Sequence, residues 1–261
     1  FSPMVDVSRD ARWGRVMETC GEDVLLNSVM GAVQSKAFQN GDISKPGNLA
    51  TCVKHFAAYG GAEAGRDYNT VELSEHVLRE FYLPAYKACI DAGADMLMPS
   101  FNTLNGVPSV ANEWLMQDIL RKEWGFDGLV ISDYAAVVEL IKHGVAENLK
   151  DAAKLAFENG CHIEMCSGGY FGHLKELIEE GVFKEEQLDE AVLKSLELKE
   201  KLGLFEDPYH GMDPEKEDEL CLTPEYRAIA RKAAGDCAVL LKNDGVLPLS
   251  KDVKKVPLIG P

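Results

Sequence analysis

Short apolar runs alternate with amphipathic stretches along most of the chain. The apolar runs lie at residues 1–7, 50–58, 95–100, 129–132 and 161–166, and their lengths suit strands of a buried sheet. Helical spacing of apolar residues and helix-capping residues predict helices over residues 23–38, 74–92, 112–124, 151–159, 171–180 and 186–202. Regular alternation of strand and helix is typical of a parallel sheet, so the pattern predicts an α/β fold.

One apolar run ends on a charge. Residues 129–132 are followed directly by Asp133 and the aromatic Tyr134, and Gly128 precedes them. A carboxylate at the end of a buried strand is costly unless the strand emerges at a site. In parallel α/β folds that site is at the carboxyl edge of the sheet. The alternative is structural, with Asp133 capping the helix that follows.

The second predicted strand carries Lys54 and His55 side by side. Neighbouring residues of a regular strand face opposite sides of the sheet, so both serve one site only where the strand becomes irregular at its end. Structural alternatives exist here too: Lys54 as half of an ion pair, and His55 as a hydrogen-bonded core residue. Arg15, in the loop around Trp13, is a further candidate, or merely braces that loop.

Together these polar residues suggest a type of ligand. Two cations and a histidine around a carboxylate suit a neutral polyol, because the cations donate to hydroxyl oxygens. They also keep the carboxylate ionised for attack on carbon. The residues expected at the strand ends are Arg15, Lys54, His55, Ser100, Asn102 and Asp133.

Composition narrows the choice of partners. Hydrophobic residues make up 46% of the chain, enough for a sizeable core. The 43 Asp and Glu residues outnumber the 27 Lys and Arg, which argues against nucleic acid or an anionic membrane surface as a partner. Seven scattered cysteines without a CxxC pair favour a reducing compartment, so we expect a cytoplasmic protein.

The composition changes after the last predicted helix of the α/β region. The acidic run at 215–220 is typical of a linker, a helix is expected from Thr223, and apolar runs at 238–241 and 256–259 predict new strands. We therefore expect a partial barrel domain at 1–205, a linker and helix at 206–236, and the start of another domain at 237–261. Five strands are fewer than the eight of a closed barrel, so we expect the segment to begin partway into one.

Several motifs resemble those of glycoside hydrolase family 3. They are FSPMVDVSRDARWGRVM at 1–17, with Ala11 where Pro is usual, KHF at 54–56, GAEAGRDYNT at 61–70, LVISDY at 129–134 and VLLKNDGVLP at 239–248. The resemblance implies a (β/α)8 TIM-like barrel followed by the start of an α/β sandwich domain. It implies a retaining glycosidase that hydrolyses terminal β-D-glucosides or β-xylosides, without metal or cofactor.

The same resemblance assigns roles to individual residues. Asp133 would be the catalytic nucleophile, and the acid/base Glu would come from the second domain of the same enzyme. The substrate would be a small oligosaccharide or an aryl or alkyl β-glycoside. The residues expected to bind it are Arg15, Lys54, His55, Met98, Phe101, Tyr134 and, more weakly placed, Arg66.

Three questions stay open from the sequence. His162 stands where the family usually has Asp, and with Glu164 and Cys166 it superficially resembles a metal site, although structural residues lining the barrel are the expectation. Lys54 would be the nucleophile if the chain were instead a Schiff-base aldolase. A fragment that binds sugars without catalysis is the third reading.

Overall fold

The computed structural model describes residues 1–209 and 211–260, and the side chain of residue 218 is left aside. The chain divides into two compact units at Gly211 and Met212. No helix in the described ranges is long and apolar enough to cross a membrane.

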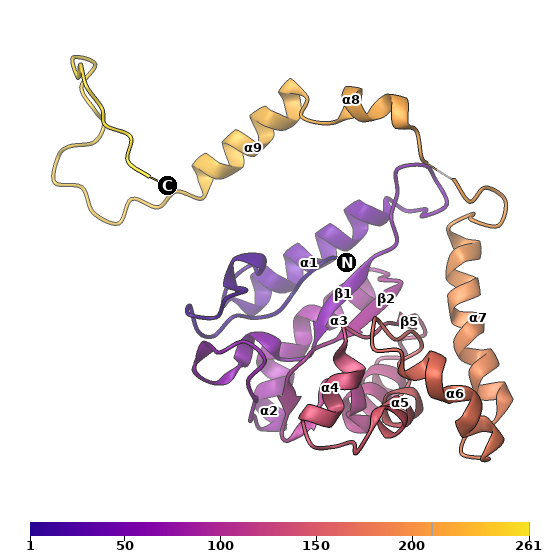
Figure 1. Ribbon diagram of the computed structural model, residues 1–261. Coiled ribbons are helices and arrows are strands. Elements are labelled where there is room, and N and C mark those ends of the chain that lie inside the picture. The colour runs from indigo at the N-terminus through magenta and orange to yellow at the C-terminus, as the bar shows by residue number, and fades with distance from the viewer. Residues whose placement is uncertain (210, 261) are drawn as a thin grey trace. The chain divides into compact units, whose positions relative to one another are not determined.

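Three parallel strands form the centre of the first unit (Figure 1). Strand β1 (Cys52–Phe56) pairs with β2 (Met96–Pro99), which pairs with β5 (Leu129–Val130). Single parallel bridges join Met4 to Lys54 and Ile131 to Ile163. The five predicted strand regions therefore lie side by side in sequence order, although the two outer ones are reduced to one bridge each. The described sheet is open, and barrel closure is not seen.

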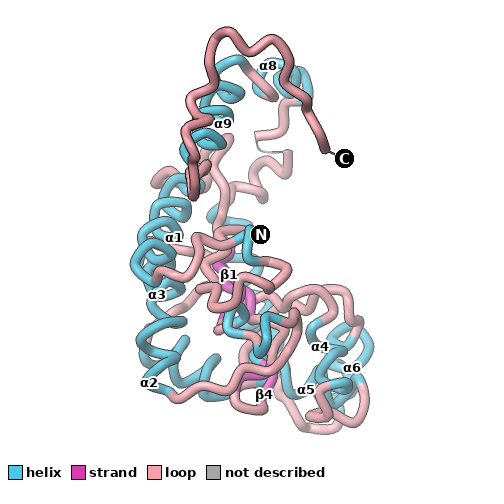
Figure 2. Tube along the Cα trace, turned by 90° about the vertical axis from the view of Figure 1, so that its left-hand side faces the viewer, coloured by secondary structure: helices cyan, strands magenta, loops and turns pink. Residues whose placement is uncertain are grey.

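Helices and short hairpin strands fill the intervals between the strands (Figure 2). The hairpin consists of β3 (Thr103–Leu104) and β4 (Val107–Pro108). The turns of 3-10 helix are η1 (Val16–Glu18), η2 (Tyr59–Gly61), η3 (Glu63–Gly65) and η5 (Ser109–Ala111). The α- and π-helices are α1 (Val24–Gln39), α2 (Glu75–Val77), η4 (Leu78–Tyr82), α3 (Leu83–Asp91), η6 (Trp114–Glu123), α4 (Ala136–Lys142), α5 (Leu149–Glu158), α6 (Gly169–Glu179) and α7 (Glu185–Lys201).

Capping residues account for where several helices begin. The Ser74 hydroxyl accepts a hydrogen bond from the Val77 backbone N–H, and Asn112 accepts one from Leu115 N–H at 3.0 Å. These bonds satisfy N–H groups that have no partner inside the helix. Both caps were predicted from the sequence and are confirmed. The helix after Asn112 winds with π-type rather than α-type hydrogen bonds, which its apolar spacing did not reveal.

Helix α1 packs against α3 through small and polar residues. Its buried positions are Asn27, Gly31, Ser35 and Gln39. A Cβ atom at Gly31 would lie 2.5 Å from Val5 Cγ1 and 2.6 Å from Cys89 Sγ. The absence of a side chain at Gly31 therefore lets α1 lie directly on the first strand region and on α3.

The second unit consists of short helices and an extended tail. The helices are η7 (Pro214–Lys216), α8 (Glu217–Leu220) and α9 (Pro224–Asp236), and Thr223 caps α9 by accepting from Tyr226 N–H as predicted. The strands expected at 238–241 and 256–259 are not formed, and these residues are exposed. The predicted strands are wrong for the part of the chain described, because a strand also needs a neighbouring strand to bond with and none pairs with these residues there.

Candidate functional site

Asp133 lies just beyond the carboxyl end of β5, with one carboxylate oxygen held and the other free. Its Oδ1 accepts a hydrogen bond from the Tyr134 backbone N–H at 2.7 Å. Its Oδ2 is buried, has no hydrogen-bond partner among the described residues, and lies 3.5 Å from His55 Nε2. Helix α4 has no side-chain cap, so the reading of Asp133 as a helix cap is wrong.

His55, on β1, is held in one orientation by a carboxylate from the first strand region. Asp6 Oδ2 lies 2.9 Å from the ring Nδ1 and accepts the His55 backbone N–H at 3.0 Å. The Tyr86 hydroxyl lies 2.7 Å from Asp6 Oδ1, and all three side chains are buried. Because the Asp6 carboxylate accepts, Nδ1 carries a proton, and Nε2 is the nitrogen presented to Asp133.

Lys54 precedes His55 and contributes an uncommitted ammonium group. The pairing register of β1 and β2 shifts between Lys54 and Phe56, so the strand is irregular where both side chains are needed, as predicted. The Lys54 side chain is half-buried, and its ammonium group makes no hydrogen bond or ion pair within the ranges that the structure describes. The ion-pair alternative for Lys54 is therefore not supported.

Arg15 reaches the same cluster but is paired. Its Nε and Nη2 donate to the two oxygens of Glu18 at 2.7 and 2.8 Å, and its guanidinium lies 5.5 Å from the centre of the Tyr59 ring. The Arg15 hydrogen bonds lower the pKa of Glu18, and the charges of Lys54 and His55 lower it further. Arg15, Glu18, Lys54 and His55 therefore lie close together as one charged group.

Aromatic rings form the floor beside this group. Tyr59 packs edge-on against His55 at 5.3 Å and against Trp13 at 5.1 Å, measured between ring centres. Phe101, a predicted site residue, lies 5.8 Å from Tyr59 and stacks on Tyr68 at 4.4 Å. Arg15 thus contacts Tyr59, whose ring also packs against His55. Arg15 can therefore support its own loop and contact a ligand at the same time.

Tyr68 extends the aromatic cluster towards the nucleophile candidate. Burial raises the pKa of its hydroxyl to about 12, and the nearby carboxylates of Glu139 and Asp133 contribute. Tyr68 is nevertheless 43% exposed and has a backbone φ of 65°, in the region that non-glycine residues seldom adopt. Residues strained in this way often occur at functional sites.

The remaining predicted site residues lie in different surroundings. Met98 is buried against Cys52 and Ile131 on the sheet. Tyr134 is 64% exposed, and Arg66 is exposed without a side-chain hydrogen bond in the described part of the chain. The structure therefore brings together Arg15, Lys54, His55, Phe101 and Asp133, but not Arg66.

Comparisons with known proteins identify the family of the chain. Residues 1–198 match the family described as "Glycosyl hydrolase family 3 N terminal domain". The chain belongs to this family. It is 43% identical over 265 residues to a periplasmic β-glucosidase of Salmonella typhimurium, covering 100% of this chain and 34% of that protein.

Solved structures of family members superpose closely on the chain. The crystal structure of a β-glucosidase from Listeria innocua has a TM-score of 0.91 and 52% identity, covering 96% of this chain and 35% of that one. A family 3 exo-β-xylosidase bound to a xylobiose aziridine probe has a TM-score of 0.84 and 31% identity, covering 97% and 34%. The Listeria enzyme has also been solved with glucose and, as a point variant, with laminaribiose. The chain spans about a third of the length of these relatives.

Glycines of the loop after KHF allow close contact with another part of the same chain. A Cβ at Gly60 would lie 2.3 Å from the Val7 carbonyl oxygen, and one at Gly65 would lie 2.8 Å from Asp10 Cγ. Both glycines let the loop pack against the segment that carries Asp6.

The apparent metal motif of the fifth strand region serves other purposes. His162 Nδ1 accepts the Val130 backbone N–H at 3.0 Å, while Glu164 accepts the N–H groups of Gly169 and Tyr170 and so caps α6. Cys166 is exposed. Within residues 1–209 and 211–260, no three His, Cys, Asp or Glu side chains are arranged to hold a metal ion.

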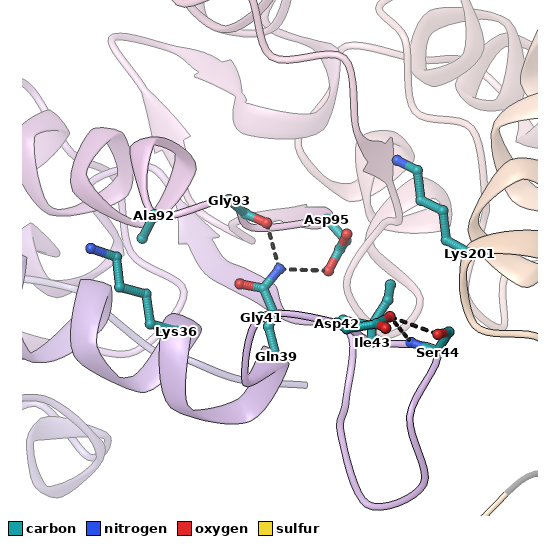
Figure 3. Close-up of a pocket in the computed structure, with 10 residues that line it drawn as sticks. All are labelled: Lys36, Gln39, Gly41, Asp42, Ile43, Ser44, Ala92, Gly93, Asp95 and Lys201. Atoms are coloured by element: carbon teal, nitrogen blue, oxygen red, sulfur yellow. Dashed lines mark hydrogen bonds between the residues drawn. The ribbon is translucent and has the colours of Figure 1, made fainter.

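A pocket of about 600 Å³ lies away from Asp133, at the amino ends of the strands (Figure 3). Gln39 at the end of α1 donates to the Gly93 carbonyl and, at 2.9 Å, to Asp95 Oδ2 just before β2. Lys36 and Lys201 line the pocket without pointing into this hydrogen-bonded group, as Figure 3 shows. Its volume alone would make it a candidate site, but the chemistry described above lies at the opposite edge of the sheet.

Sequence reasoning missed four residues of the site: Asp6, Glu18, Tyr59 and Tyr68. Asp6 gave a signal, because it is a carboxylate within an otherwise apolar strand region, as Asp133 is at the end of another. The two tyrosines gave none, since nothing local distinguishes a tyrosine under a histidine from one in the core.

Proposed function

We propose that the protein is a retaining β-glycosidase that hydrolyses terminal β-D-glucosides or β-xylosides, with Asp133 as the nucleophile. One observation carries this: Asp133 Oδ2 is buried, free of hydrogen bonds within the described ranges, and next to His55 Nε2, while Oδ1 is held by a backbone N–H. A carboxylate with one oxygen fixed and one free is oriented for attack. The relatives named above, both β-glucosidases and a β-xylosidase, support the choice of sugars.

In this mechanism, Asp133 Oδ2 attacks the anomeric carbon as the leaving oxygen is protonated. The covalent glycosyl-enzyme then reacts with water through an oxocarbenium-like transition state. Lys54 donates to a sugar hydroxyl, His55 presents Nε2 to another while Asp6 holds its Nδ1–H, and Arg15, held by Glu18, presents a fixed charge beside them. Charge-assisted hydrogen bonds of this kind are worth about 1.5–3 kcal/mol each.

The acid/base carboxyl group is proposed to come from outside this segment. A retaining glycosidase needs that group at about 5–5.5 Å from the nucleophile. Glu164 is engaged as a helix cap, and Arg15 lowers the pKa of Glu18, which suits neither for donating a proton. Family resemblance supports a complete (β/α)8 barrel, of which residues 1–205 would be part, followed by residues 206–236 as linker and an α/β sandwich from residue 237.

Two variants of the full-length protein test the assignment. Asp133→Asn should abolish turnover of aryl β-glucosides and β-xylosides without lowering the melting temperature. Asp118→Asn, which changes an exposed carboxylate paired with Lys122, is the matched control and should retain activity. A 2-fluoro sugar with a good leaving group should label Asp133 in the wild type. Labelling of another carboxylate would refute the proposal.

The aldolase alternative predicts a different trapped residue. A Schiff base would form on Lys54, and borohydride with substrate would reduce it to a stable adduct. Absence of turnover on any glycoside by the full-length protein would instead favour the sugar-binding alternative. A cytoplasmic location stays a prediction, to be tested by fractionation of the source cells.

A further inference from the structure

A second polar pocket lies at the amino end of β5, opposite the end that carries Asp133. It has a volume of about 300 Å³, and its lining includes Gln117, Arg121, His162, Gln187, Glu190 and Lys194. Arg121 is on helix η6, His162 is in the fifth strand region, and Lys194 is on α7. None of these residues takes part in the glycosidase mechanism.

The hydrogen bonds of His162 determine where its proton is. Its Nδ1 lies 3.0 Å from the Val130 backbone nitrogen, whose N–H has no other role than to donate. Nδ1 must therefore present its lone pair, and in the neutral ring the proton is on Nε2. Burial lowers the pKa of His162 to about 4, helped by the charges of Arg121 and Lys194, so the ring is neutral at pH 7.

His162 Nε2 faces another donor. It lies 3.4 Å from Arg121 Nη2. Because both groups carry hydrogen, neither can accept from the other. Arg121 Nη1 is engaged by the carbonyl oxygens of Phe126 and Gly128, but Nη2 has no acceptor among the residues that the structure describes. Two adjacent donors thus converge on one small space that lacks a protein acceptor.

The charges around the pocket limit the ligand. Asp127 pairs with Lys194 at 2.7 Å, and Glu158 with Lys154 at 3.0 Å, so these carboxylates are compensated. Arg121 shares the charge of Asp127 with Lys194, and Glu190 also lines the pocket. Burial lowers the pKa of Arg121 although the charge of Asp127 opposes the shift, so a further negative charge at Nη2 would favour the charged guanidinium. The local balance suits a single negative charge better than the double charge of phosphate.

We infer that this pocket binds a small organic carboxylate from solution. The carboxylate oxygens accept hydrogen bonds from Arg121 Nη2–H and from His162 Nε2–H. Two donors 3.4 Å apart match the spacing that a planar carboxylate can bridge. A ligand that binds the folded state alone stabilises it by mass action. The site therefore acts on stability, remote from the reaction at Asp133.

The test compares thermal unfolding of the full-length protein in sodium acetate and in sodium chloride of equal ionic strength. Acetate should raise the melting temperature of the wild type by a few degrees, and inorganic phosphate should raise it less. His162→Asn keeps an acceptor for Val130 and a donor towards Arg121, so acetate should still stabilise it. His162→Asp supplies a carboxylate within the chain, so it should no longer respond to acetate.

Other outcomes would overturn the inference. Equal melting temperatures in acetate and in chloride would mean that water alone accepts from Arg121 Nη2–H and His162 Nε2–H. A similar acetate effect in wild type and His162→Asp would place the binding elsewhere. If Glu190→Gln alone removes stability and acetate has no effect, Glu190 turns inward and is itself the acceptor. A crystal soaked in acetate should show the anion on Arg121 and His162.

Discussion

Asp6 Oδ2 accepts two hydrogen bonds from His55, one from its backbone and one from its ring. A single buried oxygen thus fixes both the strand position and the ring orientation of the residue that faces Asp133. The neighbouring Tyr86 hydroxyl completes the network through Asp6 Oδ1. The orientation of His55 is therefore determined by a residue that does not itself reach the free Asp133 oxygen.

Replacing Asp6 tests this dependence. Asp6→Asn should destabilise the protein by about 1–3 kcal/mol, because an amide cannot accept as the carboxylate does and leaves buried donors unsatisfied. Turnover per folded molecule should also fall, since the His55 ring is released. The measurements are thermal unfolding and kcat/KM on an aryl glycoside. Tyr86→Phe, which spares the His55 ring bond, should lose stability but little activity.

Replacing Lys54 should affect catalysis more than stability. Its ammonium group has no partner in the described ranges, so Lys54→Ala should change the melting temperature little. If it holds a substrate hydroxyl, kcat/KM should fall by about 10- to 150-fold, equivalent to ~1.5–3 kcal/mol. Lys45→Ala, at an exposed surface pair, is the control and should be neutral. A large fall in stability with normal kinetics would indicate a structural role.

The strands and part of the site could be predicted from the sequence. The apolar runs located all five strand regions, and the carboxyl-edge rule placed Lys54, His55 and Asp133 together before any coordinates. What the sequence could not supply was pairing across long separations. Asp6 meets His55 across 49 residues and Trp13 meets Asp67 across 54, and no local pattern encodes such contacts.

The same limitation explains the errors. The glycines after KHF allow close approach, but the sequence does not show that at Gly60 the approaching group is the backbone around Val7. The residues at 238–241 and 256–259 are apolar enough for strands, yet strand formation depends on a partner that their own sequence does not specify. The local sequence pattern therefore indicates what kind of contact a segment can make, but not which residues it contacts.

Gly60 and Gly172 form a matched pair for testing the loop. Gly60→Ala would place its Cβ 2.3 Å from the Val7 carbonyl oxygen and 3.2 Å from Ser8 Cα, and backbone atoms cannot yield as a side chain can. We expect a loss of about 2–3 kcal/mol and weaker catalysis, because the adjacent Tyr59 moves. Gly172→Ala, in α6 with nothing within 4 Å, should stabilise by about 0.5–1 kcal/mol. Denaturant unfolding of both variants would show whether the ordering holds.

His162 predicts a pH dependence of stability. Burial, with the charges of Arg121 and Lys194, lowers its pKa to about 4, whereas in the unfolded chain it is about 6.5. Between these values the unfolded chain binds more protons, so stability falls as pH drops from about 6.5 towards 4 and is complete above that window. His162→Asn removes this titration. Its melting temperature should therefore decline less steeply than that of wild type, and equal slopes would contradict the assigned shift.

The packing of α1 at Gly31 links a helix that covers the sheet to the position of the site residues. Gly31 rests on Val5, whose neighbour Asp6 orients His55. Any larger residue at position 31 would push the helix and the first strand region apart and move the carboxylate that holds the histidine. In a survey of tolerated substitutions, this position on a covering helix would therefore vary as little as the nucleophile itself, although it touches no substrate. The constraint on this position would then follow the chain of contacts to Asp133 rather than the distance from it.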